Sequence, residues 1–359
     1  MKINRESYFV RQTTLAEIGV EGQQKLQNAS VLVIGCGGLG NPLAIYLATS
    51  GVGKLHLVDF DVVSVSNLHR QVFYKTDDIG KSKAEILASE VKKRAPFTQV
   101  TFSNNAVDKQ SVLALISNFD VIVDATDNLQ VKYLINDACV LSKKPLVYGS
   151  LYKYDGYVAT FNVPDKNGDY SCNLRDAFPE IATDIPNCEQ AGTLNPIVGI
   201  ISLLQVNEVI KLITKTGKLL TNTLLVYNAL ENSQFKIKLK KNSKLHVEII
   251  FKNTTYLDEG CSTQDPSFLI EADAFKKIMN DDAFRIINVG NSYEIPLPFK
   301  VHHQVSLTSF NADDFSPDFT KSYIVVCKKG ISSYEVLLQI KEKYPMLSIF
   351  SLKEGTAHF

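Results

Sequence analysis

Residues 31–61, VLVIGCGGLGNPLAIYLATSGVGKLHLVDFD, decide the fold of this chain. They open with Val31-Leu-Val-Ile34, a short apolar run typical of a buried central strand. The glycine-rich run Gly35-Cys-Gly-Gly-Leu-Gly40 follows directly and leads into a helix expected over 39–50. A second strand is expected over 55–58. Strand, helix and strand in this order predict a βαβ unit with parallel strands.

The glycine-rich run satisfies the phosphate-binding pattern G-x-G-x-x-G. Glycines let the backbone approach a phosphate closely, and the start of the helix offers free N–H groups. Asp59 follows the second strand, where a carboxylate can accept hydrogen bonds from ribose hydroxyls. These features predict a nucleotide site, but an NAD-dependent oxidoreductase fits them equally well. A tight turn without any ligand is a third interpretation.

The rest of the first 245 residues extends this unit into a Rossmann-like, doubly wound α/β fold. Strands and helices continue to alternate, which indicates a mainly parallel sheet with helices on both faces. After Ser150 the pattern changes to strand-like segments, which predict appended antiparallel strands. Further parallel strands are expected over 99–102, 121–124 and 145–148, helices over 82–94, 109–117, 129–141 and 196–214, and the appended strands over 156–162, 223–228 and 234–239.

The length of 359 residues suits two domains. We expect a nucleotide-binding domain over 1–245 and a small α/β domain over 262–359. Between them, residues 246–261 belong to a stretch rich in Lys and Asn with an apolar strand embedded in it, which predicts a linker.

Composition excludes several classes of partner. The 38 basic and 38 acidic residues give zero formal net charge, so no overall field attracts nucleic acid or an anionic membrane. The amino terminus lacks the apolar core of a signal peptide, and the longest apolar run, 197–213, contains Gln205 and Glu208 and predicts a buried helix. Six scattered cysteines without a C-x-x-C pair argue against a disulfide framework. We expect a reduced, cytoplasmic protein that binds neither nucleic acid nor membrane.

Charged residues beyond the second strand indicate chemistry on a phosphate rather than hydride transfer. Breaking the α–β phosphate bond needs cations, because negative charge builds up on phosphate oxygens in the transition state. Arg70 and Lys83 supply such cations. Asp127, beyond the strand expected over 121–124, is placed for Mg²⁺, which prefers carboxylate and phosphate oxygens. All three are expected at the carboxyl edge of the sheet, where open α/β sheets bind their ligands.

Six motifs in this order resemble the MoeB/ThiF/HesA adenylyltransferases, relatives of the ubiquitin-activating enzymes. The motifs are Arg11-Gln12, Gly35–Gly40, Asp59-Phe-Asp61, Asn67-Leu-His-Arg-Gln71, Lys83 and Thr126-Asp-Asn128, and the resemblance covers about residues 5–240. It implies catalytic roles for Arg70, Lys83 and Asp127, with Mg²⁺ on Asp127. It also implies a homodimer, because the catalytic Arg11 would reach the active site of the other subunit. The residues implied to bind ATP are Gly35, Gly37, Gly38, Gly40, Asp59, Asp61, Asn67, Arg70, Gln71, Lys83, Asp127 and Asn128.

The resemblance implies a substrate as well. Members of this family activate the flexible Gly-Gly tail of a ubiquitin-like sulfur-carrier protein of the ThiS/MoaD type. The tail carboxylate attacks the α-phosphate of ATP, which gives an acyl-adenylate and pyrophosphate. A persulfide donor such as a cysteine desulfurase would supply the sulfur. The pathway, whether thiamine, molybdenum cofactor or another sulfur-carrier system, stays open.

The cysteines divide into structural and candidate functional residues. Relatives with a zinc site carry two C-x-x-C pairs, whereas this chain retains only Cys172, so no structural zinc is expected. Cys36 and Cys139 are interpreted as small buried hydrophobic residues. Cys188 matches a position that links covalently to the carrier in some members. A catalytic and a structural role for Cys188 are both left open.

Cys327 is the stronger candidate for sulfur chemistry. It ends an expected strand, and Cys327-Lys-Lys-Gly-Ile-Ser-Ser333 leads into a helix whose N–H groups would surround an anionic persulfide. Lys328 and Lys329 add positive charge that favours a thiolate. Residues 262–359 resemble a rhodanese domain in this loop, although rhodanese domains usually have Asp-Val-Arg where this chain has Asn288-Val-Gly290. Active sulfur transfer and a non-catalytic docking module therefore remain two interpretations of this domain.

Overall fold

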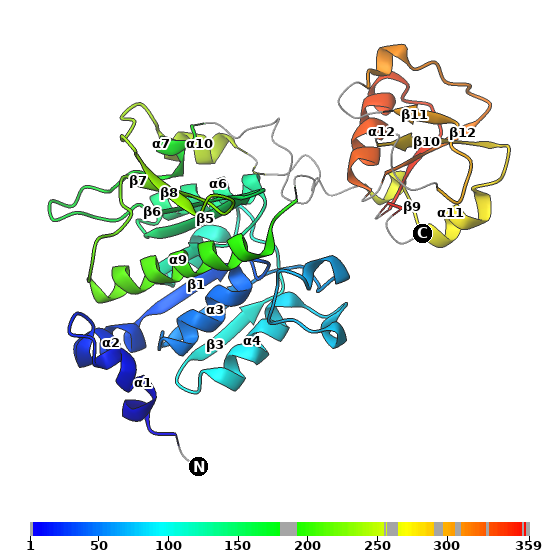
Figure 1. The fold of residues 1–359 in the computed structure, drawn as a ribbon. Coiled ribbons are helices and arrows are strands. Elements are labelled where there is room, and N and C mark those ends of the chain that lie inside the picture. Colours follow the sequence, from blue (N-terminus) through cyan, green and yellow to red (C-terminus); the bar gives the residue numbers. More distant parts are fainter. Residues whose placement is uncertain are drawn as a thin grey trace. The chain divides into compact units, whose positions relative to one another are not determined.

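The chain forms two compact units, Met1–Tyr256 and Leu257–Phe359 (Figure 1). Each unit has its own sheet and its own hydrophobic core. The computed structural model describes residues 3–179, 192–254, 256, 265–290, 297–305, 310–327, 330–353 and 355–356.

The first unit is built on an eight-stranded sheet. Its strands are β1 (Ser30–Ile34), β2 (Lys54–Val58), β3 (Gln99–Ser103), β4 (Val121–Asp124), β5 (Leu146–Tyr152), β6 (Asp155–Phe161), β7 (Thr223–Asn228) and β8 (Ser233–Lys238). They lie in the order β3-β2-β1-β4-β5-β6-β7-β8. The first five in this order are parallel, and each later strand is antiparallel to its neighbour. The predicted Rossmann-like sheet with appended antiparallel strands is thereby confirmed.

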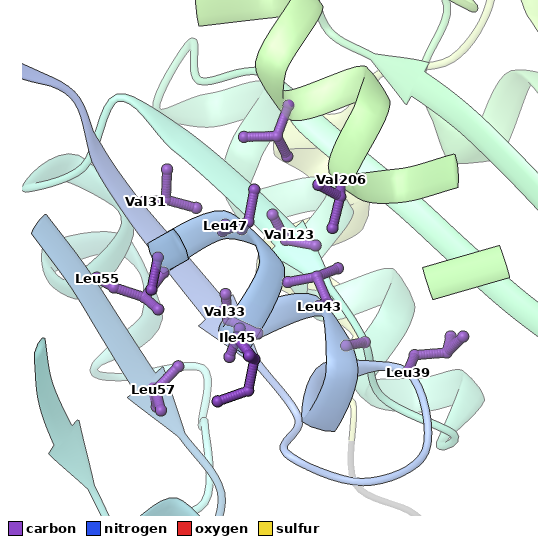
Figure 2. Close-up of a cluster of buried hydrophobic side chains, with 14 of the residues drawn as sticks. Val31, Val33, Leu39, Leu43, Ile45, Leu47, Leu55, Leu57, Val123 and Val206 are labelled. Atoms are coloured by element: carbon purple, nitrogen blue, oxygen red, sulfur yellow. The ribbon is translucent and has the colours of Figure 1, made fainter. Parts of the chain in front are cut away.

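Helices cover both faces of this sheet (Figure 1). On one face lie α3 (Gly40–Thr49), α4 (Lys83–Arg94) and α9 (Asn195–Thr214), and on the other α5 (Val112–Ser117), α6 (Leu129–Leu141) and the short α7 (Leu174–Ala177). Figure 2 shows the first of the two cores, where Leu43 and Leu47 of α3 and Val206 of α9 lie over Val33 of β1 and Val123 of β4. Buried on both faces, β1 and β4 read as continuous apolar runs in the sequence, which is why they could be predicted.

α9 is the one described helix that is long and apolar enough to cross a membrane, judged by length and composition alone. A buried core helix passes the same test, and half of the most apolar window of α9 is buried inside the unit. The polar Gln205 and Glu208 are buried too, and the Glu208 carboxylate accepts a hydrogen bond from Leu220 N at 2.8 Å. The structure therefore confirms the prediction of a buried helix at this position.

Two helices that the sequence did not predict precede the sheet, α1 (Arg5–Thr13) and α2 (Gly19–Asn28). The side chain of Asn4 caps α1 by accepting from Glu6 N at 2.8 Å. Only Phe9 of α1 is buried, so the pattern of apolar residues along this helix is weak.

Residues 247–253 correct the predicted linker over 246–261. They form α10 (Val247–Asn253) instead of a linker with an embedded strand. Val247 and Phe251 are four residues apart, share one face of the helix and are buried, with Phe251 in the core that α6 borders. A helical spacing of apolar residues was therefore hidden in a Lys- and Asn-rich stretch.

Tyr256, the last residue of the first unit, is tied to a buried ion pair. Its hydroxyl donates to the Asp137 carboxylate, which also pairs with Arg175 Nη2 at 2.7 Å. Asp137 and Arg175 are both buried. Removing one partner of such a pair leaves a buried charge without compensation, at a cost of about 3–5 kcal/mol. The first unit therefore extends to Tyr256 rather than ending near residue 245.

The second unit is a five-stranded parallel sheet flanked by helices. Its elements are β9 (Leu269–Ile270), α11 (Ala272–Ile278), β10 (Phe284–Val289), β11 (His303–Val305), β12 (Ser322–Val326), α12 (Ile331–Lys343) and β13 (Ile349–Leu352). The strand order is β11-β10-β12-β13-β9, so β12 is central. Cys327 follows β12 directly and therefore lies at the carboxyl edge of the sheet.

Candidate active site

The sheet of the first unit brings three predicted site segments to one edge. β1 lies between β2 and β4, and all three strands are parallel, so their carboxyl ends are neighbours. The glycine-rich loop follows β1, Asp59 follows β2, and the turn with Asp127 follows β4. Backbone bonds join the three segments, since Gly35 N donates to Val58 O and Ala125 N donates to Ile34 O, both at 2.8 Å.

Of the four glycines in the loop, Gly35 and Gly40 are required by backbone packing, Gly38 lies close to the Val198 side chain, and Gly37 is not required by packing. Gly35 has φ +96°, and a Cβ there would lie 2.5 Å from the Ala125 carbonyl oxygen. A Cβ on Gly40 would lie 1.8 Å from the Gly35 carbonyl oxygen. At Gly37, by contrast, the only atom a Cβ would approach is Gln71 Nε2 at 3.5 Å, which is an ordinary contact. Gly37 therefore leaves space above the loop that the protein itself does not need.

The segment 67–74 lies beside this loop. A Cβ on Gly38 would lie 4.0 Å from Cγ and Cδ of Arg70. Gln71, beside Gly37, is 2% exposed, and its Oε1 has no hydrogen-bond partner among the described residues. A buried acceptor without a partner is costly unless a ligand or a water satisfies it. The position of Gln71 thus fits a bound ligand over Gly37.

Asn67 and Arg70 are held by the short 3₁₀ helix η1 (Val65–Asn67). The buried Asn67 accepts from Ser64 N at 3.2 Å and so caps this helix. Arg70 Nη1 donates to Ser66 O at 2.8 Å. Both side chains are therefore oriented by their own segment before any ligand binds.

Tyr74 is a site residue that sequence reasoning missed. It is buried, and its hydroxyl lies within hydrogen-bond distance of two carbonyl oxygens, Cys36 O at 2.8 Å and Lys83 O at 3.0 Å. Burial raises the pKa of Tyr74 far above its usual value, so the hydroxyl stays a donor. It joins the glycine-rich loop to the first residue of α4. No signal in the sequence marks a tyrosine whose partners are backbone carbonyls.

Asp59, Asp61 and Lys83 form a charged group beside the loop. Asp59 accepts from Cys36 N at 2.6 Å and from Asp61 N at 2.8 Å, which fixes its carboxylate against the loop. Burial raises the pKa of Asp59, and the positive charge of Lys83 opposes this rise. Lys83 Nζ pairs with Asp61 Oδ2 at 2.8 Å. The structure thus brings Lys83, Asp59 and Asp61 together beside the glycine-rich loop.

Asp127 is exposed at the same edge and belongs to a turn that buried charges hold in place. Asp124 accepts from Thr126 Oγ1 at 2.7 Å and pairs with the buried Lys132 at 3.0 Å. Asn128 accepts from Val131 N at 3.0 Å and caps α6. In the described ranges, no group of three or more His, Cys, Asp or Glu side chains is arranged to hold a metal ion.

Arg11 is the predicted site residue that the structure does not bring to this edge. It is exposed on α1. α1 is anchored by Tyr8 Oη to Arg94 O at 2.9 Å and by Gln12 Nε2 to Ser50 O at 2.9 Å. Both acceptors precede the amino ends of β3 and β2, at the edge of the sheet opposite the glycine-rich loop. Arg11 therefore does not complete the site of its own chain.

In the second unit, the sulfur of Cys327 is surrounded by hydrogen-bond donors. It is 5% exposed, and its Sγ accepts from Gly330 N at 3.1 Å and from Ser333 N at 3.3 Å. Gly330 has φ +78° and is the N-cap of α12, so these N–H groups of the helix start face the sulfur. The predicted donors of the helix start are thus in place around Cys327. Lys328 and Lys329 lie outside the described residues.

Asn288 and Gly290 stand where rhodanese domains usually carry Asp and Arg. Asn288 Nδ2 donates to Gln304 Oε1 at 3.1 Å, and Gln304 Nε2 donates to Gly290 O at 2.7 Å. An uncharged amide pair therefore links β10 to β11 at this point.

The other cysteines behave as small hydrophobic residues where the structure describes them. Cys36 and Cys139 are fully buried, and burial raises the pKa of both thiols well above the usual value, as the interpretation of these two residues predicts. Cys172 is buried as well. Cys188 lies outside the described residues.

Comparison with known proteins identifies the family. A model described as "ThiF family" matches residues 9–247. The chain belongs to the ThiF family. The "Sulfur carrier protein adenylyltransferase" of Thermus thermophilus is 38% identical over 241 residues, which are 67% of this chain and 89% of the relative. The "Adenylyltransferase and sulfurtransferase MOCS3" of Caenorhabditis briggsae is 32% identical over 368 residues, 93% of this chain and 89% of the relative.

Solved structures agree with this assignment. The crystal structure of E. coli MccB with ATP matches with a TM-score of 0.60 and 25% identity, over 69% of this chain and 74% of MccB. Like its relatives, this member of the ThiF family is an adenylyltransferase, and the alignment with MOCS3 extends into the second unit.

Proposed function

We propose that this ThiF-family chain uses ATP to adenylate the C-terminal carboxylate of a ubiquitin-like sulfur-carrier protein. The position of segment 67–74 supports this proposal, because the Arg70 side chain and the unpartnered Oε1 of Gln71 lie beside a glycine-rich loop that leaves space at Gly37. A hydride-transfer site needs no such cations beside its phosphates. The printed name of the Thermus thermophilus relative supports the carrier protein as substrate.

In the proposed reaction, a carboxylate oxygen of the carrier tail attacks the α-phosphorus of ATP. The bond to the β-phosphate oxygen breaks and pyrophosphate leaves, so the product is an acyl-adenylate. Arg70 and Lys83 would balance the charge that builds up on the phosphates. Mg²⁺ usually keeps water ligands and binds through one or two carboxylates plus phosphate oxygens. The exposed carboxylate of Asp127 could be one such ligand, and the metal would neutralise further negative charge on the phosphates.

A homodimer is part of the proposal, since Arg11 does not reach the site of its own chain. α1, α2 and the turn between them expose three large apolar side chains, namely Val10, Leu15 and Val20. Exposed apolar groups of this kind fit a contact with another copy of the chain.

The second unit would supply sulfur through Cys327. A persulfide on Cys327 attacks the acyl carbon and displaces AMP, which gives an acyl disulfide between carrier and enzyme. Attack of a second thiolate on Cys327 Sγ would release the thiocarboxylate and leave a disulfide for reduction by an external thiol. Cys188 is our candidate for that thiolate. In the alternative proposal, the second unit only docks a partner.

Exchange of ³²P-pyrophosphate into ATP tests the adenylation, with and without a Gly-Gly-tailed sulfur carrier from the same organism. We expect exchange that requires the carrier. Absence of exchange with the full set of carriers from that organism would contradict the proposed substrate.

Replacing Cys327 separates the two proposals for the second unit. In Cys327→Ser we expect wild-type pyrophosphate exchange but no thiocarboxylate on the carrier. Mass spectrometry detects the thiocarboxylate as an increase of about 16 Da in the mass of the carrier, and this increase should be absent with the variant. Thiocarboxylate formed at the wild-type rate by this variant would favour the docking module.

A further inference from the structure

Two buried hydroxyl groups are linked to Cys327 by hydrogen bonds and have no role in the proposed sulfur transfer. Ser333, in the first turn of α12, and Ser351, in β13, are both 0% exposed. Ser351 Oγ donates to Ser333 Oγ at 2.9 Å, and Ser333 Oγ lies 3.3 Å from Cys327 Sγ. Three side chains from three parts of the unit thus form a chain of hydrogen bonds that ends on the sulfur.

This chain can serve both states of the sulfur. A thiol donates its S–H to Ser333 Oγ, which is the arrangement of the structure. A thiolate has no hydrogen to donate, but the Ser333 hydroxyl can turn its own hydrogen toward the sulfur while it still accepts from Ser351. A thiolate would then receive three donors, two backbone N–H groups and one hydroxyl. A buried anion requires such donors, because water is excluded around it.

We propose that Ser351 is a positioning residue for sulfur transfer, which orients and polarises the Ser333 hydroxyl so that it stabilises the Cys327 thiolate. This inference rests on the proposed sulfur transfer by the second unit. In that scheme the thiolate is the nucleophile that takes up a sulfur atom from the persulfide donor, and it is restored when the external thiol reduces the disulfide at the end of the cycle. Linked hydrogen bonds in a buried site strengthen one another, so loss of Ser351 weakens the bond that Ser333 makes.

The test is the rate at which iodoacetamide alkylates Cys327 in the full chain at pH 7, followed on the Cys327 peptide by mass spectrometry. The thiolate attacks the CH₂ carbon and iodide leaves, so the rate follows the thiolate population. We expect Ser333→Ala to slow alkylation about tenfold, since a hydrogen bond to an anion is lost. We expect Ser351→Ala to slow it roughly two- to fivefold, since only the polarisation of that bond is lost.

The chain offers a matched control at the other end of the same strands. Ser322 Oγ, at the start of β12, donates to Ser348 Oγ at 3.0 Å just before β13. Ser348→Ala removes an exposed serine–serine hydrogen bond at the opposite end of the strands from Cys327, and we expect an unchanged rate of alkylation.

A double variant distinguishes positioning from a general effect on the fold. If Ser351 acts through Ser333, Ser351→Ala has no further effect in the Ser333→Ala background. A wild-type rate in Ser351→Ala, or the same slowing in both backgrounds, would overturn the inference. Should Ser333→Ala fail to fold, the rate of Ser351→Ala alone decides.

Carrier-dependent pyrophosphate exchange, measured in parallel, should be unchanged in every variant. Its absence from the wild type would contradict the adenylation proposal and leave this inference standing.

Discussion

Lys83 shows how a single residue of this site is held ready for a ligand. Its side chain is 8% exposed, while its partner Asp61 is 50% exposed. Burial removes most of the hydration of the Lys83 ammonium group, which costs free energy. The attraction of one half-exposed carboxylate at 2.8 Å offsets only part of that cost. Asp59, close enough to interact electrostatically, adds a second negative charge. The pair therefore contributes little to stability, and the charge of Lys83 is available for phosphate oxygens.

We predict that Lys83→Ala lowers carrier-dependent pyrophosphate exchange by roughly 10²–10³-fold, the usual loss when one group that stabilises transition-state charge is removed. The melting temperature should change little, because the ion pair is worth little. Lys81→Ala is the control, since Lys81 is 57% exposed and its contact with Asp78 is long, 3.9 Å. Exchange within twofold of wild type in Lys83→Ala would argue against the role of this lysine.

Residues of the site differ in how far the sequence reveals them. The location of Lys83 and Asp127 near the carboxyl edge was predictable because they follow strands of a parallel sheet in order, and the catalytic roles of Arg70, Lys83 and Asp127 stay predictions. Tyr74 and Ser351 were not predictable, because their partners are a carbonyl or a hydroxyl that only the folded chain brings near. The role of Arg11 is predicted by resemblance alone, and the structure has this residue exposed at the opposite edge of the sheet.

At the scale of an element, the glycine-rich loop allows packing and ligand binding to be separated. Gly40→Ala places a Cβ 1.8 Å from a backbone carbonyl, whereas Gly37→Ala places one 3.5 Å from a single side-chain atom. We expect Gly40→Ala to lower the free energy of unfolding by about 2 kcal/mol or more, as overpacking against backbone does. Gly37→Ala should leave it within roughly 0.5 kcal/mol and still weaken ATP binding at least tenfold, since the methyl group fills the space above the loop.

Denaturant unfolding and calorimetric titration with ATP measure the two quantities for each variant. Gly37→Ala with wild-type affinity for ATP would show that the nucleotide does not approach the loop at this position.

Elements were predicted well where both faces are buried and poorly elsewhere. β1 and β4 of the first unit and β12 of the second stand out as apolar runs, and the structure has them where expected. β9 consists of two residues, too few for a period to appear. The sequence predicts a linker at α10 because only Val247 and Phe251 of this helix are buried and the flanking sequence is polar.

At the scale of the whole molecule, the position of Arg11 means that its proposed catalytic role requires a second subunit. α1 holds this residue at the amino edge of the sheet, while Arg70 and Lys83 lie at the carboxyl edge. A twofold dimer can place the amino edge of one subunit at the carboxyl edge of the other, and its symmetry then completes two equal sites. Each site would combine Arg70 of one chain with Arg11 of its partner.

We therefore predict complementation between two inactive variants. Arg11→Ala and Arg70→Ala, each alone, should lose nearly all carrier-dependent exchange. Co-expressed with different tags and purified as a mixed dimer, they should regain about half of the wild-type activity, because one of the two sites then has both arginines intact. The mixed dimer of Arg70→Ala with Lys83→Ala is the control, since both changes lie on the same side of the interface and each site keeps one defect. A mixed Arg11→Ala and Arg70→Ala dimer no more active than its parents would show that Arg11 does not act across subunits.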